Sequence, residues 1–338
     1  MGNKQTISGL KPGDQVLSFF VVRKSELKTK KDGSPYLVLN LGDSSGRITA
    51  TIWNDAKHLY DICREGTIVK VKGSVRTYGE NLQLTVERIR PAEAADSVSP
   101  AEFIPRASFD IDALYETLIV KIDSLQDPHL KHLLKTVFHN KETAEKVKTA
   151  PGGKLWHHAY AGGLLEHTMS VAAVCETVAA IYPALNRDLL ITGALLHDIG
   201  KIEEYDVQKG FIDFTDRGRL HGHITMGARW IEELISGFSG SEAFPEELKN
   251  LVVHLILSHQ GELEHGSPVL PATLEAIVLY YADEMDAKAN AVCRIIERDS
   301  APGKEWSQYI NLLNRFIYLG RRRKTDSEQP GTLFEDPV

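Results

Sequence analysis

Histidine and aspartate side chains recur within otherwise apolar segments in the later part of this chain. They stand in five short stretches: WHHAYAGGLLEHT (156–168), LLHDIGK (195–201), GRLHGHI (218–224), ILSHQG (256–261) and YYADEMDAK (280–288). Polar groups at such positions cost free energy unless they are paired or bind a cation. Imidazole and carboxylate ligands suit Mn, Fe, Co, Ni or Zn, and no stretch contains cysteine. The pattern therefore predicts a divalent metal centre with ligands from several helices.

The adjacent pair His197–Asp198 is the centre of this prediction. Neighbouring helical residues point about 100° apart, and Gly200 indicates a helix end here. Near a helix end, both side chains can converge on one site. A lone buried histidine or aspartate is more simply a paired core or capping residue, but an adjacent pair calls for further ligands, which the other stretches supply.

The elements that must position these residues fall into two classes. Residues 10–92 alternate in polarity as five short strands, with a small helix between the third and the fourth, and this order is typical of an OB-fold barrel. From about residue 108 the apolar spacing is helical. Helices are expected at about 160–182, 187–199, 223–237, 245–258, 272–298 and 304–320.

The predicted fold is thus multidomain: an all-β OB-fold barrel followed by an all-α domain. The expected divisions are an OB-fold domain at 1–92, a linker at 93–107, a helical connector at 108–150, a metal-binding helical domain at 151–320 and a flexible tail at 321–338.

Charge is distributed unevenly between these parts. Of the net charge of −7 over 338 residues, residues 1–92 carry +6 and the remainder carries −13. A basic module suits a polyanion and an acidic one collects cations, although +6 is also compatible with an ordinary soluble surface. The N-terminus lacks the apolar region of a signal peptide, no apolar run approaches the length of a membrane span, and the three cysteines lie far apart. We therefore expect a cytoplasmic protein without a membrane partner.

The histidine and aspartate stretches resemble the HD-domain superfamily of metal-dependent phosphohydrolases. The resemblance implies an all-helical fold that hydrolyses a phosphate ester, and the two extra histidines before the last aspartate mark its two-metal branch. It assigns these metal ligands: His167, His197, Asp198, His223, His259 and Asp283.

The OB module and the histidine and aspartate stretches that follow it, taken together and in this order, are similar to the YhaM family of 3′–5′ exoribonucleases. The similarity covers roughly residues 10–320. The resemblance implies hydrolysis of single-stranded RNA to nucleoside 5′-monophosphates, with single-stranded DNA as a second candidate substrate. Two divalent ions are expected, Mn²⁺ first, with Fe, Co, Ni or Zn as alternatives. Relatives often have a second histidine where this chain has Gln260, so a third metal is not expected.

Three residues are predicted to act in catalysis. Asp198 would bridge the two ions. Lys201, three residues later, would stabilise charge on a phosphate oxygen, although it could also be a solvated helix end. His158 or its neighbour His157 would bind phosphate or protonate the leaving oxygen.

Two assignments stay open in the sequence. His221 lies two residues before His223 and could replace it as a ligand. Asp286 follows Asp283 by three residues on the same helix face, where it would either orient a ligand or meet a lysine.

The OB module also contains candidate contacts to nucleic acid. Single strands stack their bases on aromatic side chains along a basic groove. The predicted contacts are Trp53 and Tyr78 for the bases and Lys28, Lys30, Lys31 and Arg76 for the phosphates. Each of these residues taken alone is more simply core or solvated surface.

Two other functions fit parts of the pattern. An HD enzyme for a small nucleotide or a cyclic dinucleotide would share the ligands, but the basic OB module and the lack of a GYP motif after His259 argue against it. A nucleic-acid-binding protein with a purely structural HD domain would not need all six ligand positions. Apolar faces at 108–148 and in the last helix suit a core and a homo-oligomer contact equally well.

Overall fold

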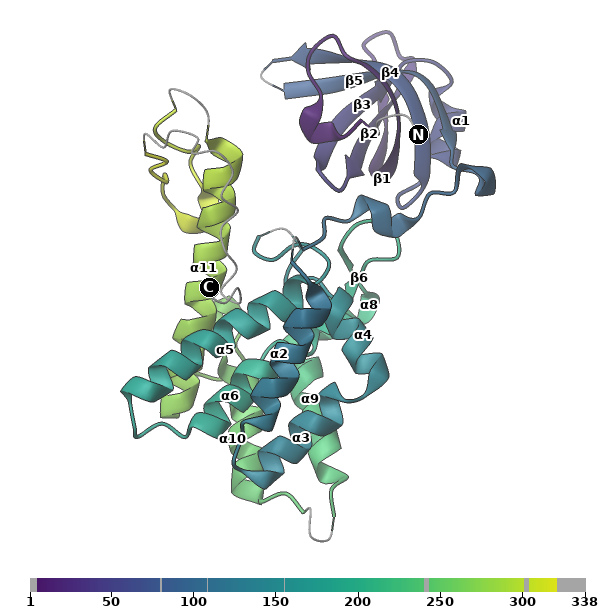
Figure 1. Ribbon diagram of the computed structural model, residues 1–338. Coiled ribbons are helices and arrows are strands. Elements are labelled where there is room, and N and C mark those ends of the chain that lie inside the picture. The colour runs from purple at the N-terminus through teal and green to yellow at the C-terminus, as the bar shows by residue number, and fades with distance from the viewer. Residues whose placement is uncertain are drawn as a thin grey trace. The chain divides into compact units, whose positions relative to one another are not determined.

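The computed structural model describes residues 5–320 apart from 80, 108, 155, 240–242 and 301–303. It divides into two compact units (Figure 1). The barrel unit is Met1–Arg106 with Tyr205–Phe214, and the helical unit is Ala107–Glu204 with Thr215–Val338. The predicted tail at 321–338 lies outside the described residues.

A closed five-stranded barrel in the order β1-β2-β3-β5-β4 forms the first unit and confirms the predicted OB-fold. Its elements are β1 (Gln15–Thr29), β2 (Pro35–Asp43), β3 (Gly46–Ile52), α1 (Ala56–Ile62), β4 (Ile68–Tyr78) and β5 (Asn81–Pro91). The first half of β1 pairs with β4 and the second half with β2, and a bulge between Val22 and Lys24 bends the strand where its second pairing begins. Alternate side chains, such as Leu37 and Leu39, fill the barrel.

Two segments outside the predicted OB boundaries belong to the barrel unit: residues 93–106, which lie in the predicted linker, and Tyr205–Phe214. The remaining elements of this unit are 3-10 helices at Ile7–Gly9, Ala94–Asp96 and Pro100–Phe103 and the short strands β6 (Tyr205–Asp206) and β7 (Asp213–Phe214). Phe211, between β6 and β7, is buried with Val21 and Phe103. The chain therefore leaves the helical unit after Glu204 and returns to it at Thr215.

Helices form the second unit (Figure 1). They are α2 (Ile111–Asp123), α3 (Pro128–Phe138), α4 (Lys141–Thr149), α5 (Gly163–Ile181), α6 (Arg187–Leu196), α7 (Lys201–Glu204), α8 (Asp216–His221), α9 (His223–Ser236), α10 (Glu246–Ser258) and α11 (Leu274–Asp299), with 3-10 turns at Leu263–His265 and Asn311–Leu313. One apolar core unites α5, α6 and α9–α11 with α2–α4, which occupy the predicted connector.

Side-chain caps fix where several of these helices begin. Asp110, Asp127, Asn186 and Thr273 each accept a hydrogen bond from a backbone N–H of the first turn. Such caps satisfy donors that have no partner within the helix. Helix α6, which leads directly to His197, is buried at nearly every residue after Arg187.

Helix α5 is long and apolar enough to cross a membrane by composition alone. Half of that stretch is buried inside the unit, and its side chains belong to the apolar core. It is also the helix that carries His167. Its apolar character is therefore that of a core helix.

The chain after α11 forms a hairpin, and the predicted last helix at 304–320 is wrong. Two backbone bridges join the hairpin strands: Trp306 to Tyr318 and Ile310 to Arg315. Asn314 closes the turn at φ +52°, a left-handed conformation that asparagine tolerates better than most residues. Aromatic side chains favour the extended conformation here over the helix that the apolar spacing predicted.

Candidate metal centre

The six predicted ligands converge in the helical unit as two adjacent groups. His167, His197 and Asp283 form the first group, and Asp198, His223 and His259 form the second. Within each group, the candidate ligand atoms lie within 4.8 Å of one another. All six residues except His223 are buried, and His223 is partly buried.

Asp198 joins the two groups. Its Oδ2 lies 3.4 Å from Nε2 of both His167 and His197. Its Oδ1 lies 3.3 Å from Nε2 of His223 and 3.5 Å from Nε2 of His259. Because each oxygen faces a different group, this one carboxylate can bridge two ions.

Helix ends position three of the four histidines. His197 caps the C-terminus of α6, His259 caps α10, and His223 is the first residue of α9. Gly200 allows α9 to begin against the turn that follows α6, because a Cβ at Gly200 would lie 2.1 Å from the carbonyl oxygen of His223.

The same helix ends orient two of the rings. His197 Nδ1 donates to the Ala194 carbonyl oxygen at 2.9 Å, and His259 Nδ1 donates to the Ile256 carbonyl oxygen at 2.7 Å. Carbonyls of a last helical turn have no helical partner, so they are available as acceptors. Both rings therefore present Nε2 to the site.

Carboxylates orient the other two rings. His167 Nδ1 lies 2.7 Å from Asp286 Oδ2, and His223 Nδ1 lies 3.1 Å from Glu204 Oε1. Asp286 therefore orients a predicted ligand, which was one of its two expected roles. Glu204 was missed, because it lies 19 residues before His223 and no spacing links the two.

The carboxylates concentrate negative charge at the centre, which favours a bound cation. Burial disfavours the protonated ring of His167, but hydrogen bonds to the surrounding aspartates raise its pKa well above the ordinary value. Burial also opposes protonation of His223, yet the nearby carboxylates of Asp198 and Glu204 raise its pKa to about 9. A proton on a histidine ring or a bound metal cation can neutralise this negative charge.

Three buried atoms indicate a metal rather than protons alone. Asp198 Oδ1, His223 Nε2 and His259 Nε2 are buried without a hydrogen-bond partner. Buried polar atoms are costly unless they are satisfied. Imidazole nitrogen and carboxylate oxygen together fit a divalent transition metal, so these residues suit one.

Lys201 lies beside the bridging carboxylate and is not a solvated helix end. Its side chain is 6% exposed, and Nζ donates to Asp198 Oδ2 at 2.5 Å and to the Gly152 carbonyl oxygen at 2.7 Å. Burial favours the neutral acid of Asp198, but the charges of Lys201 and His197 hold the pKa of that carboxyl well below its usual range.

His158 is placed differently from its predicted role. Its Nδ1 lies 2.9 Å from Glu166 Oε2, and its Nε2 lies 2.8 Å from Asp286 Oδ2. With both nitrogens engaged, the ring is not available to a substrate and instead supports Asp286.

His157, the neighbour weighed for the same role, lies at the same ring distance from His167 as His158 does, but it has a nitrogen without a hydrogen-bond partner. The His157 ring is 5.3 Å from that of His167, and its buried Nδ1 has no hydrogen-bond partner. Burial, with a smaller contribution from Lys201, lowers its pKa to about 3. The neutral ring can accept a hydrogen bond.

A third group of possible ligand atoms among the described residues is His158, His167 and Asp286, and the remaining histidines belong to none of the three groups. His221 is exposed at the end of α8, and of the two histidines only His223 belongs to a group of possible ligand atoms. His254 Nε2 accepts the Ala272 backbone N–H at 2.9 Å and serves packing.

The predicted nucleic-acid residues of the barrel unit occupy two separate places. Trp53, 48% exposed, stacks on Tyr36 with ring centroids 5.1 Å apart, and Lys30 Nζ lies 5.4 Å from the Trp53 ring centroid. Lys28 pairs with Tyr36 across β1 and β2, and the exposed Lys31 follows in the next turn. These residues form one aromatic and basic corner.

Tyr78 and Arg76 lie at the β4–β5 hairpin instead. Tyr78 is 78% exposed and pairs with Asn81. The parallel register of β3 and β5 puts Asn81 about six residues from the level of Trp53, roughly 20 Å of strand. The two predicted stacking residues therefore cannot hold adjacent bases.

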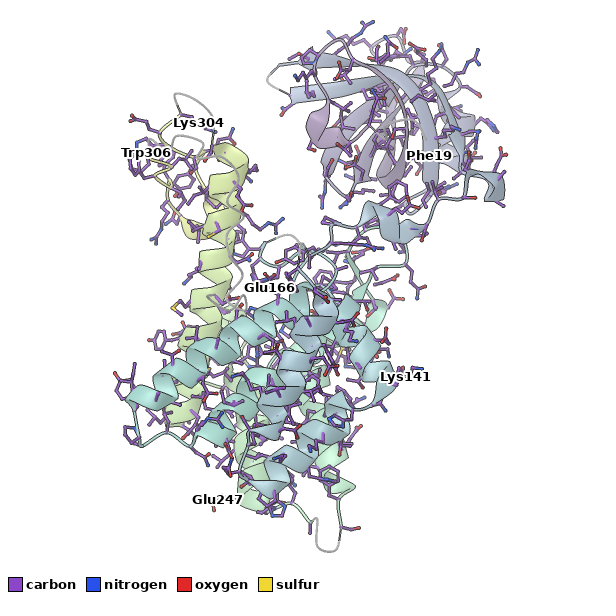
Figure 2. The ribbon with its side chains drawn as sticks, in the orientation of Figure 1. Phe19, Lys141, Glu166, Glu247, Lys304 and Trp306 are labelled. Atoms are coloured by element: carbon purple, nitrogen blue, oxygen red, sulfur yellow. The ribbon has the colours of Figure 1, made fainter. Side chains whose placement is uncertain are left out.

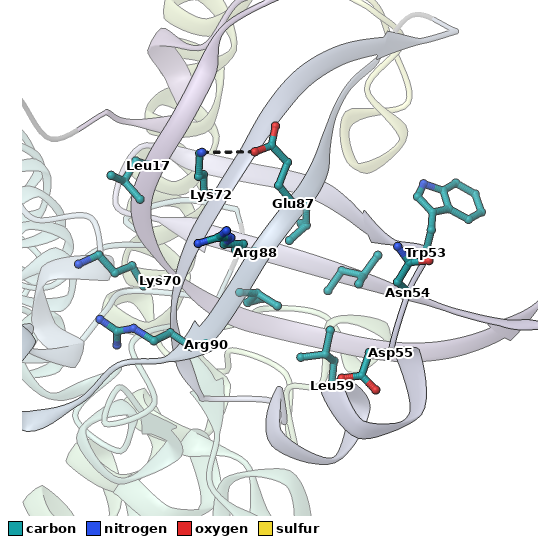
Figure 3. Close-up of a pocket in the computed structure, with 13 residues that line it drawn as sticks. Leu17, Trp53, Asn54, Asp55, Leu59, Lys70, Lys72, Glu87, Arg88 and Arg90 are labelled. Atoms are coloured by element: carbon teal, nitrogen blue, oxygen red, sulfur yellow. Dashed lines mark ion pairs between the residues drawn. The ribbon is translucent and has the colours of Figure 1, made fainter.

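A basic groove next to Trp53 was missed (Figure 3). It has a volume of about 710 Å³, with Trp53 at one end and Lys70 and Arg90 at the other. Lys72, which pairs with Glu87 at 3.7 Å, and the exposed Arg88 lie between them. Alternating positions on β4 and β5 bring these cations to one face, a signal that the strand pattern contained.

Comparisons with known families match both units. The HD domain family matches residues 164–288, and the OB-fold nucleic acid binding domain family matches residues 21–92. Among solved structures, a domain of replication protein A from Methanococcus maripaludis is 27% identical over 27% of this chain and 97% of that chain, with a TM-score of 0.24.

Curated relatives align along most of the chain. The 3′–5′ exoribonuclease YhaM of Bacillus subtilis is 33% identical over 90% of this chain and 95% of its own length. The 3′–5′ exoribonuclease YhaM of Bacillus velezensis is 34% identical over the same shares. The resemblance seen in the sequence is confirmed: this chain belongs to the YhaM family of 3′–5′ exoribonucleases.

Proposed function

We propose that this protein is a metal-dependent exoribonuclease that shortens single-stranded RNA from its 3′ end and releases nucleoside 5′-monophosphates. The observation that carries the proposal is Asp198, whose two oxygens face two separate groups of metal-ligand atoms. The curated relatives, which align with this chain over 95% of their own length, are named as exoribonucleases of this polarity.

Two divalent ions, Mn²⁺ first, would occupy the centre. His167, His197 and Asp283 would hold one ion, His223 and His259 the other, and Asp198 both. When bound, such ions supply a nucleophile at neutral pH by lowering the pKa of a coordinated water, and they stabilise charge on the phosphoryl group.

The remaining residues act by position and charge. Lys201 keeps the carboxylate of Asp198 ionised, and its ammonium group would stabilise charge on a phosphate oxygen bound beside that carboxylate. Asp286 and Glu204 fix the rings of His167 and His223. His157 is the candidate to accept a hydrogen bond from the RNA, in place of His158.

The barrel unit would hold the strand. Its exposed aromatics and lysines match the way OB-folds bind single strands, by base stacking along a cationic surface. Single-stranded DNA is a second substrate to test, because base stacking does not read the 2′-hydroxyl. A cytoplasmic location and self-association remain predictions.

The test is gel analysis of a 5′-labelled single-stranded RNA with metal-stripped protein and added Mn²⁺. The proposal expects a ladder that shortens from the 3′ end and is absent with the His197→Ala/Asp198→Ala variant. Intact RNA under every divalent metal, with turnover of a cyclic dinucleotide, would instead identify an enzyme for small nucleotides.

A further inference from the structure

Strands β4 and β5 carry cations in directly paired positions on the outer face of the barrel. In their antiparallel register, Lys70 lies opposite Arg90, and Lys72 lies opposite Arg88. Like charges directly opposite each other destabilise a sheet. A bound anion would relieve this repulsion, so the face suits a ligand with several negative charges.

One of the two pairs is largely neutralised within the barrel unit. Arg90 donates to both oxygens of Asp96, at 2.6 and 2.9 Å, and its Nη1 lies 3.6 Å from Glu93. Lys70 Nζ lies 3.4 Å from the same Asp96 carboxylate. The ring of Phe19, which Figure 2 labels in the barrel, also meets Lys70, with Nζ 5.0 Å from the ring centroid. Lys70 and Arg90 therefore already have partners.

The other pair, Lys72 and Arg88, is available to a ligand. Lys72 Nζ lies 3.7 Å from Glu87, a long contact between two exposed side chains. Surface ion pairs of this kind contribute little to stability. Within the part of the chain that the structure describes, the exposed Arg88 has no ion pair. These two cations are therefore the ones that an anion would meet.

Both cations border the basic groove of Figure 3, which also has an apolar lining. The apolar residues that line it are Ile52, Leu59, Val86 and Ile89. The groove volume of about 710 Å³ is that of an ordinary ligand pocket. Apolar side chains next to cations match a single-stranded nucleic acid, which offers base faces and phosphates.

Trp53 connects this groove with the aromatic and basic corner. It lines the groove and also a second pocket of about 470 Å³, to which Lys30 contributes. OB-folds usually hold oligonucleotides on the face of their second and third strands and on the loops beside it. In this barrel, β1 separates β4 from β2, and β5 separates β4 from β3. The groove would therefore lead a strand from the usual face around the barrel.

We propose that the basic groove is a second path for single-stranded RNA on the barrel unit, in which Lys72 and Arg88 bind phosphates. The inference rests on the proposed function for its ligand. An acidic peptide would also meet two cations and an apolar lining. The connection through Trp53 favours RNA, because one strand stacked on that ring can occupy both pockets.

The test is the salt dependence of RNA binding by the full-length protein in a metal chelator, measured by fluorescence anisotropy with labelled oligo(A) of twelve nucleotides. Lys72→Gln/Arg88→Gln should lower the slope of log K against log salt by about 1.4, because each phosphate contact of a single strand contributes about 0.7. Arg88→Gln alone should lower it by about half as much. Lys11→Gln/Arg64→Gln is the matched control, since it removes two exposed cations of the barrel unit that do not line the groove, and it should leave the slope unchanged.

A wild-type slope in Lys72→Gln/Arg88→Gln would overturn the proposal. If this variant instead lost affinity for a labelled twelve-residue oligo-glutamate peptide while its RNA binding stayed unchanged, the groove would hold an acidic peptide, which also overturns it. Failure of the wild type to shorten RNA with Mn²⁺ would count against the proposed function alone, because the binding assay requires no hydrolysis.

Discussion

In the metal centre, each histidine has its second ring nitrogen held by a partner, whereas the predicted RNA contacts of the barrel, apart from the partly buried Lys30, are exposed. His167 and His197 show the first arrangement, with partners at 2.7 and 2.9 Å. Trp53 and Tyr78 show the second, at 48% and 78% exposure. Bond cleavage needs fixed geometry, while binding of a variable strand needs adaptable surfaces. Substitutions should therefore have large effects in the centre and graded effects on the barrel.

The largest effect is expected from Asp198→Asn. The amide removes the negative charge that both ligand groups share, so RNA hydrolysis with Mn²⁺ should fall to the level of the metal-free protein. RNA affinity in chelator should stay within twofold of wild type, because in the proposed function the barrel unit holds the strand. A parallel loss of both properties would break the division of labour between the units.

The next effect concerns the residues that orient the ligands. Asp286→Asn weakens the acceptor of the His167 ring and should reduce Mn²⁺ affinity about 10- to 100-fold in calorimetry. Glu284→Gln, on the same helix and paired with Lys288, is the matched control. Equal Mn²⁺ affinities in the two variants would show that Asp286 does not position a ligand.

A smaller effect is expected on the barrel. Trp53→Ala should weaken RNA binding in chelator about tenfold through loss of a stacking surface. Because Tyr78 is remote from Trp53, the free-energy changes of Trp53→Ala and Tyr78→Ala should add in the double variant. A strong departure from additivity in anisotropy titrations would mean that both rings contact the same short stretch of RNA.

The basic corner should respond to salt. Replacing Lys28, Lys30 and Lys31 by Ala should reduce the slope of log K against log salt by about 2, since each phosphate contact contributes about 0.7 for a single strand. Lys141→Ala, at an exposed lysine of the helical unit, should leave the slope unchanged. If the triple variant keeps the wild-type slope, the cations of the Figure 3 groove become the candidates.

The smallest effect is a pH dependence of barrel stability. Hydrogen bonds from Arg90 lower the pKa of Asp96 well below its ordinary value near 4. The ionised pair stabilises the folded state above that ordinary value, and the contribution is lost as pH falls toward the lowered pKa. Asp96→Asn should therefore lower the melting temperature at neutral pH, and the difference from wild type should shrink in acid. A constant difference across the titration would contradict this account.

The sequence predicted the two fold classes and the stretches that supply the metal centre because their signals are local, and the family resemblance selected the six ligands within those stretches. Strand alternation around Leu37 and Leu39 fixes the barrel face, and the pair His197–Asp198 needs external partners wherever it stands. The excursion of Tyr205–Phe214 into the barrel unit left no such signal. It depends on packing between segments remote in sequence, such as that of Phe211 with Val21 and Phe103.

The orienting residues were harder to predict for the same reason. Glu204 meets His223, and His158 meets Asp286, only after several helices have packed. At residues 304–320, the helical spacing of the apolar residues predicted a helix. Paired aromatic side chains and the left-handed backbone of Asn314 produce a hairpin instead. A prediction from helical spacing alone does not take the β-propensity of those side chains into account.

The most direct test of the account is the number of ions that the centre binds. Titration of metal-stripped, full-length protein with Mn²⁺ in a calorimeter should give two ions per chain, and Asp198→Asn should weaken both binding events because its oxygens face both groups. A single ion per wild-type chain, or two ions bound equally well by the variant, would contradict a centre built around one shared carboxylate.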